Sequence, residues 1–125
     1  MIGARMIVPT IPVSDLDRAR TFYGETLGLE HLWENAASIR FRAGPASEVS
    51  TFKRPGLVTE HTLAHFEVDD IGAAVRELEA RGVPFVDYTE GPLITTNHVA
   101  RIGPALGAWF RDPDGNYLGL RQADV

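Results

Sequence analysis

The sequence has no cysteine, no excess of positive charge and no long apolar run, and each absence excludes a class of function. Without cysteine there is no disulfide framework, no thiolate nucleophile and no zinc or iron–sulfur site with Cys ligands. No apolar run approaches the ~20 residues that a membrane span needs. Residues 1–6 lack the apolar stretch and cleavage site of a signal peptide. We therefore expect a cytoplasmic protein with no membrane partner.

The charge balance also limits the partners. Twelve Lys and Arg residues against seventeen Asp and Glu residues give a formal net charge of −5, and the basic residues form no cluster. Such a chain is a poor match for nucleic acid, so none is expected as a partner. With 125 residues, of which 44% are hydrophobic and 23% charged, the chain has the composition of one globular domain spanning residues 1–125.

A weak internal duplication is the most informative feature. Residues 7–13 and 63–68 are short β-prone runs, and each leads into a stretch with apolar residues at helical spacing. Asp15 and Asp70 stand at the expected N-cap positions, 55 residues apart, and a glycine follows each helical stretch. The two halves of the chain therefore begin with the same strand–helix pattern.

Three further strands are expected in each half. They cover residues 29–34, 37–42 and 49–53 in the first half, and residues 83–88, 108–111 and 117–121 in the second. Residues 112–116, Asp-Pro-Asp-Gly-Asn, are a strong turn sequence before the last strand. The sequence thus predicts an α+β fold of two tandem βαβββ modules, about residues 6–55 and 61–122.

A concave site follows from this arrangement. One helix covers one face of each small sheet, so two adjacent sheets would form a cup for a small ligand. Alternation along the strands assigns Phe66, Leu118 and Leu120 to the core. The residues expected to face the cup by the same rule are Val8, Thr10, Leu63, His65, Glu67, Tyr117, Gly119 and Arg121.

These patterns resemble those of the vicinal oxygen chelate superfamily, which includes glyoxalase I, extradiol dioxygenases, fosfomycin-modifying enzymes and bleomycin-resistance proteins. The first module is similar in residues 13–19, with Phe22-Tyr23 and Leu27-Gly28-Leu29. The second is similar in residues 66–71, Gly82-Val83 and residues 109–116. The resemblance covers residues 7–122 and implies the glyoxalase/bleomycin resistance/dihydroxybiphenyl dioxygenase fold, with a cupped mixed sheet.

The enzymes of that superfamily hold a divalent metal with His, Gln or Glu from the first and last strands of each module. The matching positions here include Val8, Leu63 and Gly119, and residues 49–53 contain no acid or histidine. Side chains of Val, Leu and Gly supply no metal donor. The resemblance therefore implies a protein with no metal and no cofactor, and it disfavours metal-dependent catalysis.

A rebuilt metal site or a metal-free enzyme is the alternative. His61 and His65 would lie about 13 Å apart on a strand, too far for one ion. His65 and Glu67, about 6.6 Å apart, would need two more donors, where Thr10 and Tyr117 are poor ligands. His65 or Glu67 as a general base would support a lyase, isomerase or dioxygenase of the same superfamily, so both are weak catalytic candidates.

Aromatic and apolar residues dominate the rest of the expected cup. Flat rings stack on planar ligands, and arginine pairs with carboxylates. The long stretch of residues 89–107 is expected to fold over the mouth of the cup, with His98 in a solvated loop. The full set of candidate ligand-binding residues is Val8, Thr10, Trp33, Phe41, Phe52, Leu63, His65, Glu67, Trp109, Tyr117 and Arg121, with Arg42 as a further polar group.

The prediction is a metal-free binding protein that sequesters a small hydrophobic or aromatic ligand, an antibiotic or metabolite, without changing it. The resemblance to bleomycin-resistance proteins also implies a homodimer. A third class, a regulatory or structural dimer with a filled cup, stays open and predicts no ligand response of Trp33 or Trp109.

Overall fold

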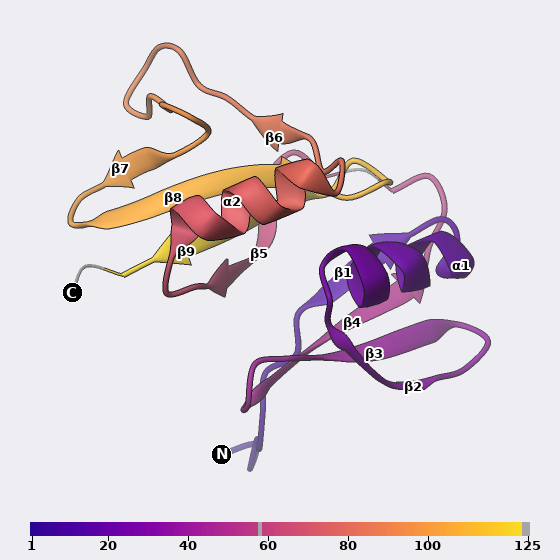
Figure 1. Cartoon of the computed structure of the whole chain (residues 1–125). Coiled ribbons are helices and arrows are strands. Elements are labelled where there is room, and N and C mark those ends of the chain that lie inside the picture. Colours follow the sequence, from indigo (N-terminus) through magenta and orange to yellow (C-terminus); the bar gives the residue numbers. More distant parts are fainter. Residues whose placement is uncertain (58, 124–125) are drawn as a thin grey trace. The chain divides into compact units, whose positions relative to one another are not determined.

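The computed structural model of the chain describes residues 1–57 and 59–123 and divides into two compact units. Unit 1 is Met1–Val58 and unit 2 is Thr59–Val125. Each unit contains one helical segment and one mixed sheet, as Figure 1 shows. This confirms the predicted α+β class and the repeated βαβββ pattern.

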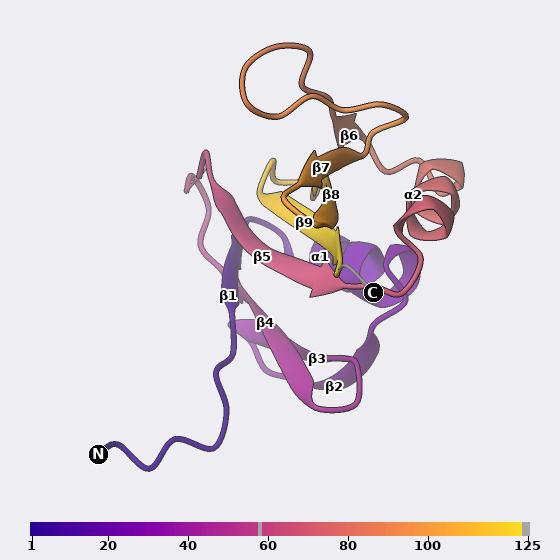
Figure 2. The ribbon, with the colours of Figure 1, turned by 90° about the vertical axis from the view of Figure 1, so that its left-hand side faces the viewer.

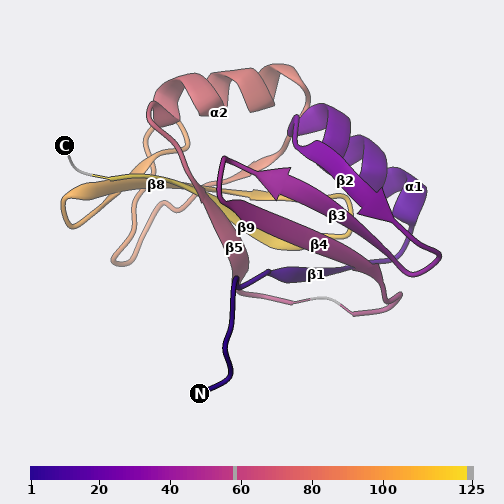
Figure 3. The same cartoon turned by 90° about the horizontal axis from the view of Figure 1, so that it is seen from below.

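The sheet of unit 1 has the strand order β1-β4-β3-β2, which Figure 3 shows. Its strands are β1 (Thr10–Val13), β2 (Glu30–Glu34), β3 (Ser38–Ala43) and β4 (Ser47–Lys53). Strand β1 runs parallel to β4, and the other neighbours are antiparallel. A parallel pair needs a crossover connection, and the helical segment between β1 and β2 begins that crossover.

The helical segment of unit 1 begins as α1 (Leu16–Ala19) and continues as the π-helix η1 (Arg20–Thr26). The Asp15 carboxylate caps it, accepting from the backbone N–H groups of Asp17 and Arg18 at 2.9 and 3.1 Å. At the other end the Leu27 N–H donates to the Phe22 carbonyl at 2.8 Å, the spacing of a π turn. The predicted N-cap is confirmed, but the expected regular α-helical period gives way to wider turns.

The core of unit 1 lies between this helical segment and one face of the sheet. Phe22 and Tyr23 contact each other edge to face at 5.2 Å, and Tyr23 packs against Phe41 at 5.9 Å. The buried side chains on the helix side come from alternate positions of three strands: Ile11, Val13, Ile39, Phe41, Val49 and Thr51. Pro12 and Ser50, which stand between them, are buried as well. Alternation therefore leaves the opposite set of side chains on the other face of the same sheet.

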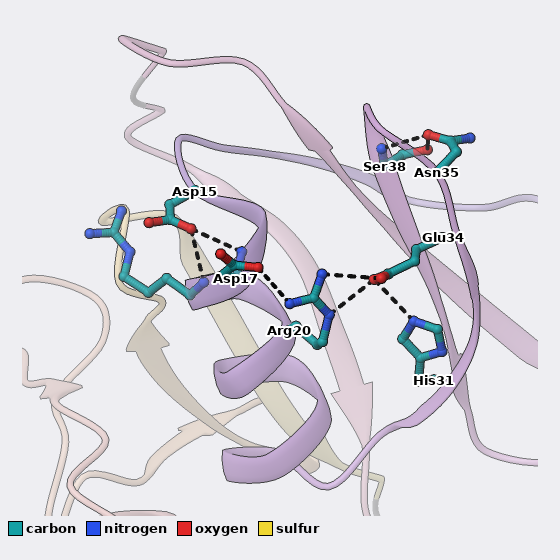
Figure 4. A network of polar contacts seen from close by, with 8 residues as sticks. Asp15, Asp17, Arg20, His31, Glu34, Asn35 and Ser38 are labelled. Carbon is teal, nitrogen blue, oxygen red and sulfur yellow. Dashed lines mark hydrogen bonds and ion pairs between the residues drawn. The ribbon is translucent and has the colours of Figure 1, made fainter.

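A polar network ties η1 to β2 on the surface of unit 1 (Figure 4). The Arg20 guanidinium donates to Asp17 at 2.7 Å and to Glu34 at 3.0 Å. His31 Nε2 lies 3.2 Å from the same Glu34 carboxylate. These hydrogen bonds lower the pKa of Glu34, and the bond from Arg20 has a larger effect than the bond from His31.

The sheet of unit 2 repeats the order of unit 1, as β5-β9-β8-β6, with β5 parallel to β9. Its strands are β5 (Thr62–Glu67), β6 (Phe85–Val86), β8 (Ala105–Arg111) and β9 (Tyr117–Gln122). An additional strand, β7 (Ala100–Ile102), pairs with β8. Figure 2 shows the long connection in orange that joins β6 to β7.

Helix α2 (Ile71–Ala80) covers one face of this sheet. The Asp70 side chain accepts from the Ala73 N–H at 3.0 Å, and Gly82 follows the helix with φ 84°, as the sequence predicts. Ile71, Val75 and Leu78 form the buried stripe of the helix. The buried sheet residues beneath it are Ala108, Phe110, Leu118 and Leu120.

The predicted turn between β8 and β9 is also confirmed. The Asp112 carboxylate, 4% exposed, accepts from the N–H groups of Asp114 and Asn116, each at 2.9 Å. The Asn116 side-chain amide donates to the other Asp112 oxygen at 2.9 Å. This closed set of bonds holds the hairpin that aligns β8 with β9.

Two expectations about the strands are wrong. Strand β1 begins at Thr10 rather than at residue 7, and the Pro9 carbonyl just before it accepts from the Ser50 N–H of β4 at 2.9 Å. The stretch 89–107, expected to be a connection between strands, contains β7 and the first residues of β8, which starts at Ala105. Its expected role as a lid stays a prediction. Across residues 1–57 and 59–123, no helix combines the length and the apolar character needed to cross a membrane.

Candidate functional site

Each sheet presents one face that its own helix does not cover, and we call it the helix-free face of that unit. The side chains on it are those that alternate with the buried core residues. Because α2 packs over Phe110 and Leu118, their strand neighbours Trp109 and Gly119 lie on the helix-free face of unit 2. Most of the sequence-predicted ligand-binding residues lie on these two faces.

Three polar side chains form a line on the helix-free face of unit 2. Strand pairing places His65 opposite Gly119, and Glu67 opposite Arg121. The Glu67 carboxylate lies 2.8 Å from His65 Nε2 and accepts from Arg121 Nη1 at 2.7 Å. All three side chains are about half exposed, so their mutual ion pairing contributes little to stability. They remain accessible as polar contacts for a ligand.

Trp109 is the central aromatic side chain of the same face. Its indole lies over Gly107, where an added Cβ would come within 3.3 Å of the ring. The Tyr88 ring contacts the indole edge to face, with centroids 5.4 Å apart and planes at 88°. Tyr88 thus holds the indole at its edge, and Gly107 lets the Trp109 ring and the Ile102 side chain approach the β8 backbone closely.

Gly119 and Tyr117 complete this surface along β9. A Cβ on Gly119 would lie 3.2 Å from the His65 Cβ and 3.7 Å from Thr62 Cγ2, so the glycine lets β5 and β9 pack closely beside His65. Tyr117 pairs with Arg111, whose guanidinium lies 4.6 Å from the ring centroid and donates to the Tyr117 hydroxyl. The face therefore combines aromatic surface with two guanidinium groups.

The helix-free face of unit 1 carries a smaller group of the same kind. The Arg40 guanidinium lies 4.9 Å from the Trp33 ring centroid and donates to Glu48 at 2.9 Å. Trp33 is 45% exposed, which is unusual for a large aromatic residue. By register, Thr10 and Phe52 belong to this face as well.

The structure contradicts the prediction for Phe41 and leaves Val8 and Leu63 outside the regular strand alternation that assigned them to the site. Phe41 is fully buried against Tyr23 on the helix side, because it alternates with Arg40 and Arg42 and not with Ile39. Val8 precedes β1 and has no strand position. Leu63 is the extra residue of a bulge between Thr62 and Ala64, so simple alternation assigns it no face.

Sequence reasoning missed several residues of these faces. Arg40, Glu48 and Arg111 were not among the predicted site residues, although alternation with buried Ile39 and Phe110 was a signal that could have found them. Tyr88 was assigned only to a strand. Its contact with Trp109 joins residues far apart in the sequence, and no local pattern predicts such a contact.

The donor groups do not fit the divalent metal of the superfamily's enzymes. Val8, Leu63 and Gly119 supply no side-chain donor, and Glu67 is engaged by His65 and Arg121. Within the described ranges, no cluster of three or more His, Cys, Asp or Glu side chains could hold a metal ion. No metal-dependent step is derived from these residues.

The fold and these faces define a protein of the paired βαβββ class. A sequence model of the Glyoxalase/Bleomycin resistance protein/Dioxygenase superfamily matches residues 5–120, and the chain belongs to this superfamily. A search of the curated proteins finds no match.

Solved structures with the same fold include proteins of different activity. An antibiotic-binding protein, TnmS3 from Streptomyces sp. CB03234, is 24% identical with a TM-score of 0.74, covering 99% of each chain. A bleomycin resistance determinant encoded on the transposon Tn5 is 23% identical, with a TM-score of 0.74 over 98% of this chain and 100% of that one. A lactoylglutathione lyase from Agrobacterium tumefaciens is 20% identical, with a TM-score of 0.69 over 96% and 95%.

Proposed function

We propose that the protein is a small-molecule binding protein of the bleomycin-resistance type, which sequesters a hydrophobic or aromatic ligand such as an antibiotic or metabolite. The observation that carries the proposal is the helix-free face of unit 2. There Trp109 presents an aromatic surface beside the line of polar side chains His65, Glu67 and Arg121. A planar ligand would stack on the indole, and its polar groups would pair with the charged side chains.

The contacts of Trp109 favour a ligand with a flat ring system. Tyr88 holds the indole from its edge, and Gly107 and Gly119 place no side chain beside it. A preorganised ring loses little conformational freedom on binding, so more of the stacking free energy contributes to affinity. The lack of metal donors at Val8, Leu63 and Gly119 favours binding over the metal-dependent chemistry of the superfamily's enzymes.

The structural neighbours support the same class of ligand. Two of them, an antibiotic-binding protein and a bleomycin resistance determinant, are described by what they bind or resist. Sequestration works by mass action: the protein lowers the concentration of free ligand, so protection requires protein in amounts comparable with the ligand. No turnover is expected.

The experiment is a titration of the protein with bleomycin and with a panel of planar aromatic antibiotics, followed by tryptophan fluorescence and calorimetry. Trp109→Phe should weaken binding by roughly 2- to 10-fold, the range expected for loss of one aromatic contact. Trp33→Phe is the matched control for the fluorescence, since it leaves the unit 2 face intact. The proposal would be contradicted if no compound of the panel bound, or if the Trp109→Phe and native proteins bound with equal affinity.

A metal-free enzyme that uses His65 or Glu67 as a general base is a second candidate, favoured by the 2.8 Å contact between the two side chains. Mass spectrometry of the ligand recovered after incubation separates the two candidates. Sequestration returns the ligand unchanged, whereas catalysis yields a product whose formation stops in Glu67→Gln.

We also propose a homodimer in the cytoplasm. Light scattering would then give twice the 13.7 kDa chain mass. A mass of one chain at micromolar concentration would contradict the dimer without affecting the binding proposal.

A further inference from the structure

A histidine on the helix side of unit 2 bridges two carboxylates. His98 Nε2 lies 2.6 Å from Glu79 of α2, and Nδ1 lies 2.9 and 3.1 Å from the two oxygens of Asp87. The imidazole also stacks on Phe85 at 5.2 Å, with the planes at 22°. The expectation that His98 is a solvated loop residue is therefore wrong, since its side chain is only 25% exposed.

This bridge requires the charged form of the histidine. A neutral imidazole carries one N–H and can donate to one carboxylate, leaving a lone pair facing the other. The imidazolium donates to both. The two hydrogen bonds accordingly raise the pKa of His98, and the bond to Asp87 has a larger effect than the bond to Glu79. Deprotonation would break one of the two carboxylate links that the His98 ring makes.

His98 stands in a tight hairpin turn that aims its side chain. Asn97 and His98 have φ values of 52° and 71°, the positive values that a two-residue hairpin turn requires at both central positions. Thr96 and Val99 close the turn with two backbone hydrogen bonds of 2.8 and 3.1 Å. The turn therefore presents His98 to Glu79, Asp87 and Phe85 in a defined position.

Other charged groups near the bridge come mainly from α2. A pocket of about 730 Å³ is lined by His98 and Glu79 together with Asp70 and Arg76 of the same helical region, and by the neutral Gln122 of β9. Asp70 favours the imidazolium and Arg76 disfavours it. Glu79 and Asp87 are the carboxylates in direct contact with the ring, so they dominate its charge state.

The bridge is connected to the helix-free face through β6 and the two residues after it. Alternation places Phe85 and Asp87 toward His98, and Val86 and Tyr88 toward Trp109. Asp87, which contacts the imidazole, is thus the direct neighbour of Tyr88, which holds the Trp109 indole. A displacement of Asp87 would move Tyr88 on the other face.

Thr95 strengthens this connection. Its hydroxyl oxygen accepts from the Tyr88 N–H at 3.0 Å and lies 3.1 Å from Asp87 Oδ1, and its own N–H donates to the Tyr88 carbonyl at 2.8 Å. The segment that carries His98 is therefore hydrogen-bonded to Asp87 and to the Tyr88 backbone together.

We propose that His98 is a positioning residue for the ligand face of unit 2: its imidazolium fixes Asp87 to α2, sets Tyr88 against Trp109, and makes ligand affinity fall when His98 loses its proton. The statement about affinity rests on the proposed function. The statement about Trp109 does not, because it concerns the protein without ligand.

The first experiment follows the Trp109 indole N–H and the imidazole resonances by NMR from pH 5.5 to 9, without ligand. It is performed in Trp33→Phe, which leaves one indole, combined with His65→Gln, which removes the imidazole on the face of Trp109. The indole resonance should shift with the midpoint of the His98 titration, and His98→Gln should abolish the shift. Asp87→Asn should lower the midpoint, because it removes one of the two carboxylates.

His61→Gln is the matched control, since His61 is an exposed histidine of the same unit, and the shift should persist in it. An indole resonance that does not move with His98, or that moves equally in His98→Gln, would overturn the proposal. Each variant's amide spectrum at pH 6 shows whether it is folded. If His98→Gln does not fold, the comparison of midpoints in Asp87→Asn decides the question.

The second experiment measures bleomycin affinity by calorimetry at pH 6 and pH 9. The expected weakening at pH 9 is roughly 2- to 10-fold, the range of one aromatic contact, and it should disappear in His98→Gln. Unchanged affinity together with a normal indole titration would overturn the link to binding. If bleomycin does not bind at either pH, the proposed function fails for this probe, while the indole titration still tests the positioning role of His98.

Discussion

A matched pair of phenylalanine substitutions tests the assignment of the two faces of the unit 1 sheet. Phe41 and Phe52 lie on the neighbouring strands β3 and β4, but Phe41 is fully buried against Tyr23 whereas Phe52 lies half-buried on the helix-free face. Removing a fully buried phenylalanine ring destabilises a protein by about 3–5 kcal/mol, since the lost transfer free energy is joined by a cavity term. We therefore expect Phe41→Ala to cost about that amount.

Phe52→Ala should cost less, for two reasons. Complete burial of such a side chain is worth about 1.5–3 kcal/mol, and the partly exposed Phe52 ring contributes somewhat less than that. Its removal also leaves a surface depression rather than an enclosed cavity. The expected difference between the two variants is about 1–3 kcal/mol, which is a measurable part of the roughly 6–19 kcal/mol stability expected for a chain of this size.

The assay is guanidinium chloride unfolding followed by far-UV circular dichroism, with both variants and the native protein at the same concentration. Phe41→Ala should shift the midpoint strongly at unchanged slope, and Phe52→Ala should shift it little. Equal shifts, or a larger shift for Phe52→Ala, would refute the assignment of Phe41 to the core and of Phe52 to the helix-free face.

Three further predictions concern polar groups. The pKa of His98 is raised in the folded state, so its contribution to stability is full below about pH 6.5 and is lost as the pH rises through the pKa of the folded protein. The His98→Gln variant should therefore be less stable than the native protein at pH 5.5 and differ much less from it at pH 9, which urea unfolding would show. Asp112→Ala should cost about 2–3 kcal/mol in thermal unfolding by leaving the buried Asn116 amide without its acceptor, and an unchanged melting temperature would contradict this. Arg20→Gln should raise the pKa of Glu34 toward its ordinary value, measured by carboxyl NMR, whereas an unmoved pKa would mean that Arg20 is not its cause.

Most of the fold could be predicted from local patterns. The aspartate caps at Asp15 and Asp70 lie where the sequence places them, because a capping side chain acts on amides only two or three residues away. The turn from Asp112 to Asn116 is equally local. The π turns after Ala19 were not predicted, because residue spacing alone does not distinguish a widened turn from an α-helical one.

The candidate site could be predicted only where the strands follow strict alternation. His65, Glu67 and Arg121 lie on one face as expected, since β5 and β9 are regular from Ala64 onward. Strict alternation does not apply to Leu63, because Leu63 is the extra residue of a bulge just before Ala64. Phe41 was misplaced because a phenylalanine suits both an aromatic ligand surface and a core, and the choice depends on whether Tyr23 packs against it.

The sequence by itself determined the repeated βαβββ plan, the helix caps and the absence of metal donors at Val8, Leu63 and Gly119, because each depends on residue type or on neighbours close in the chain. Only the tertiary structure decided that Tyr88 holds Trp109 and that His98 joins Glu79 to Asp87. These contacts join residues 11 to 21 positions apart in the sequence. Such distant groups meet only when strand register and helix packing fix their positions together.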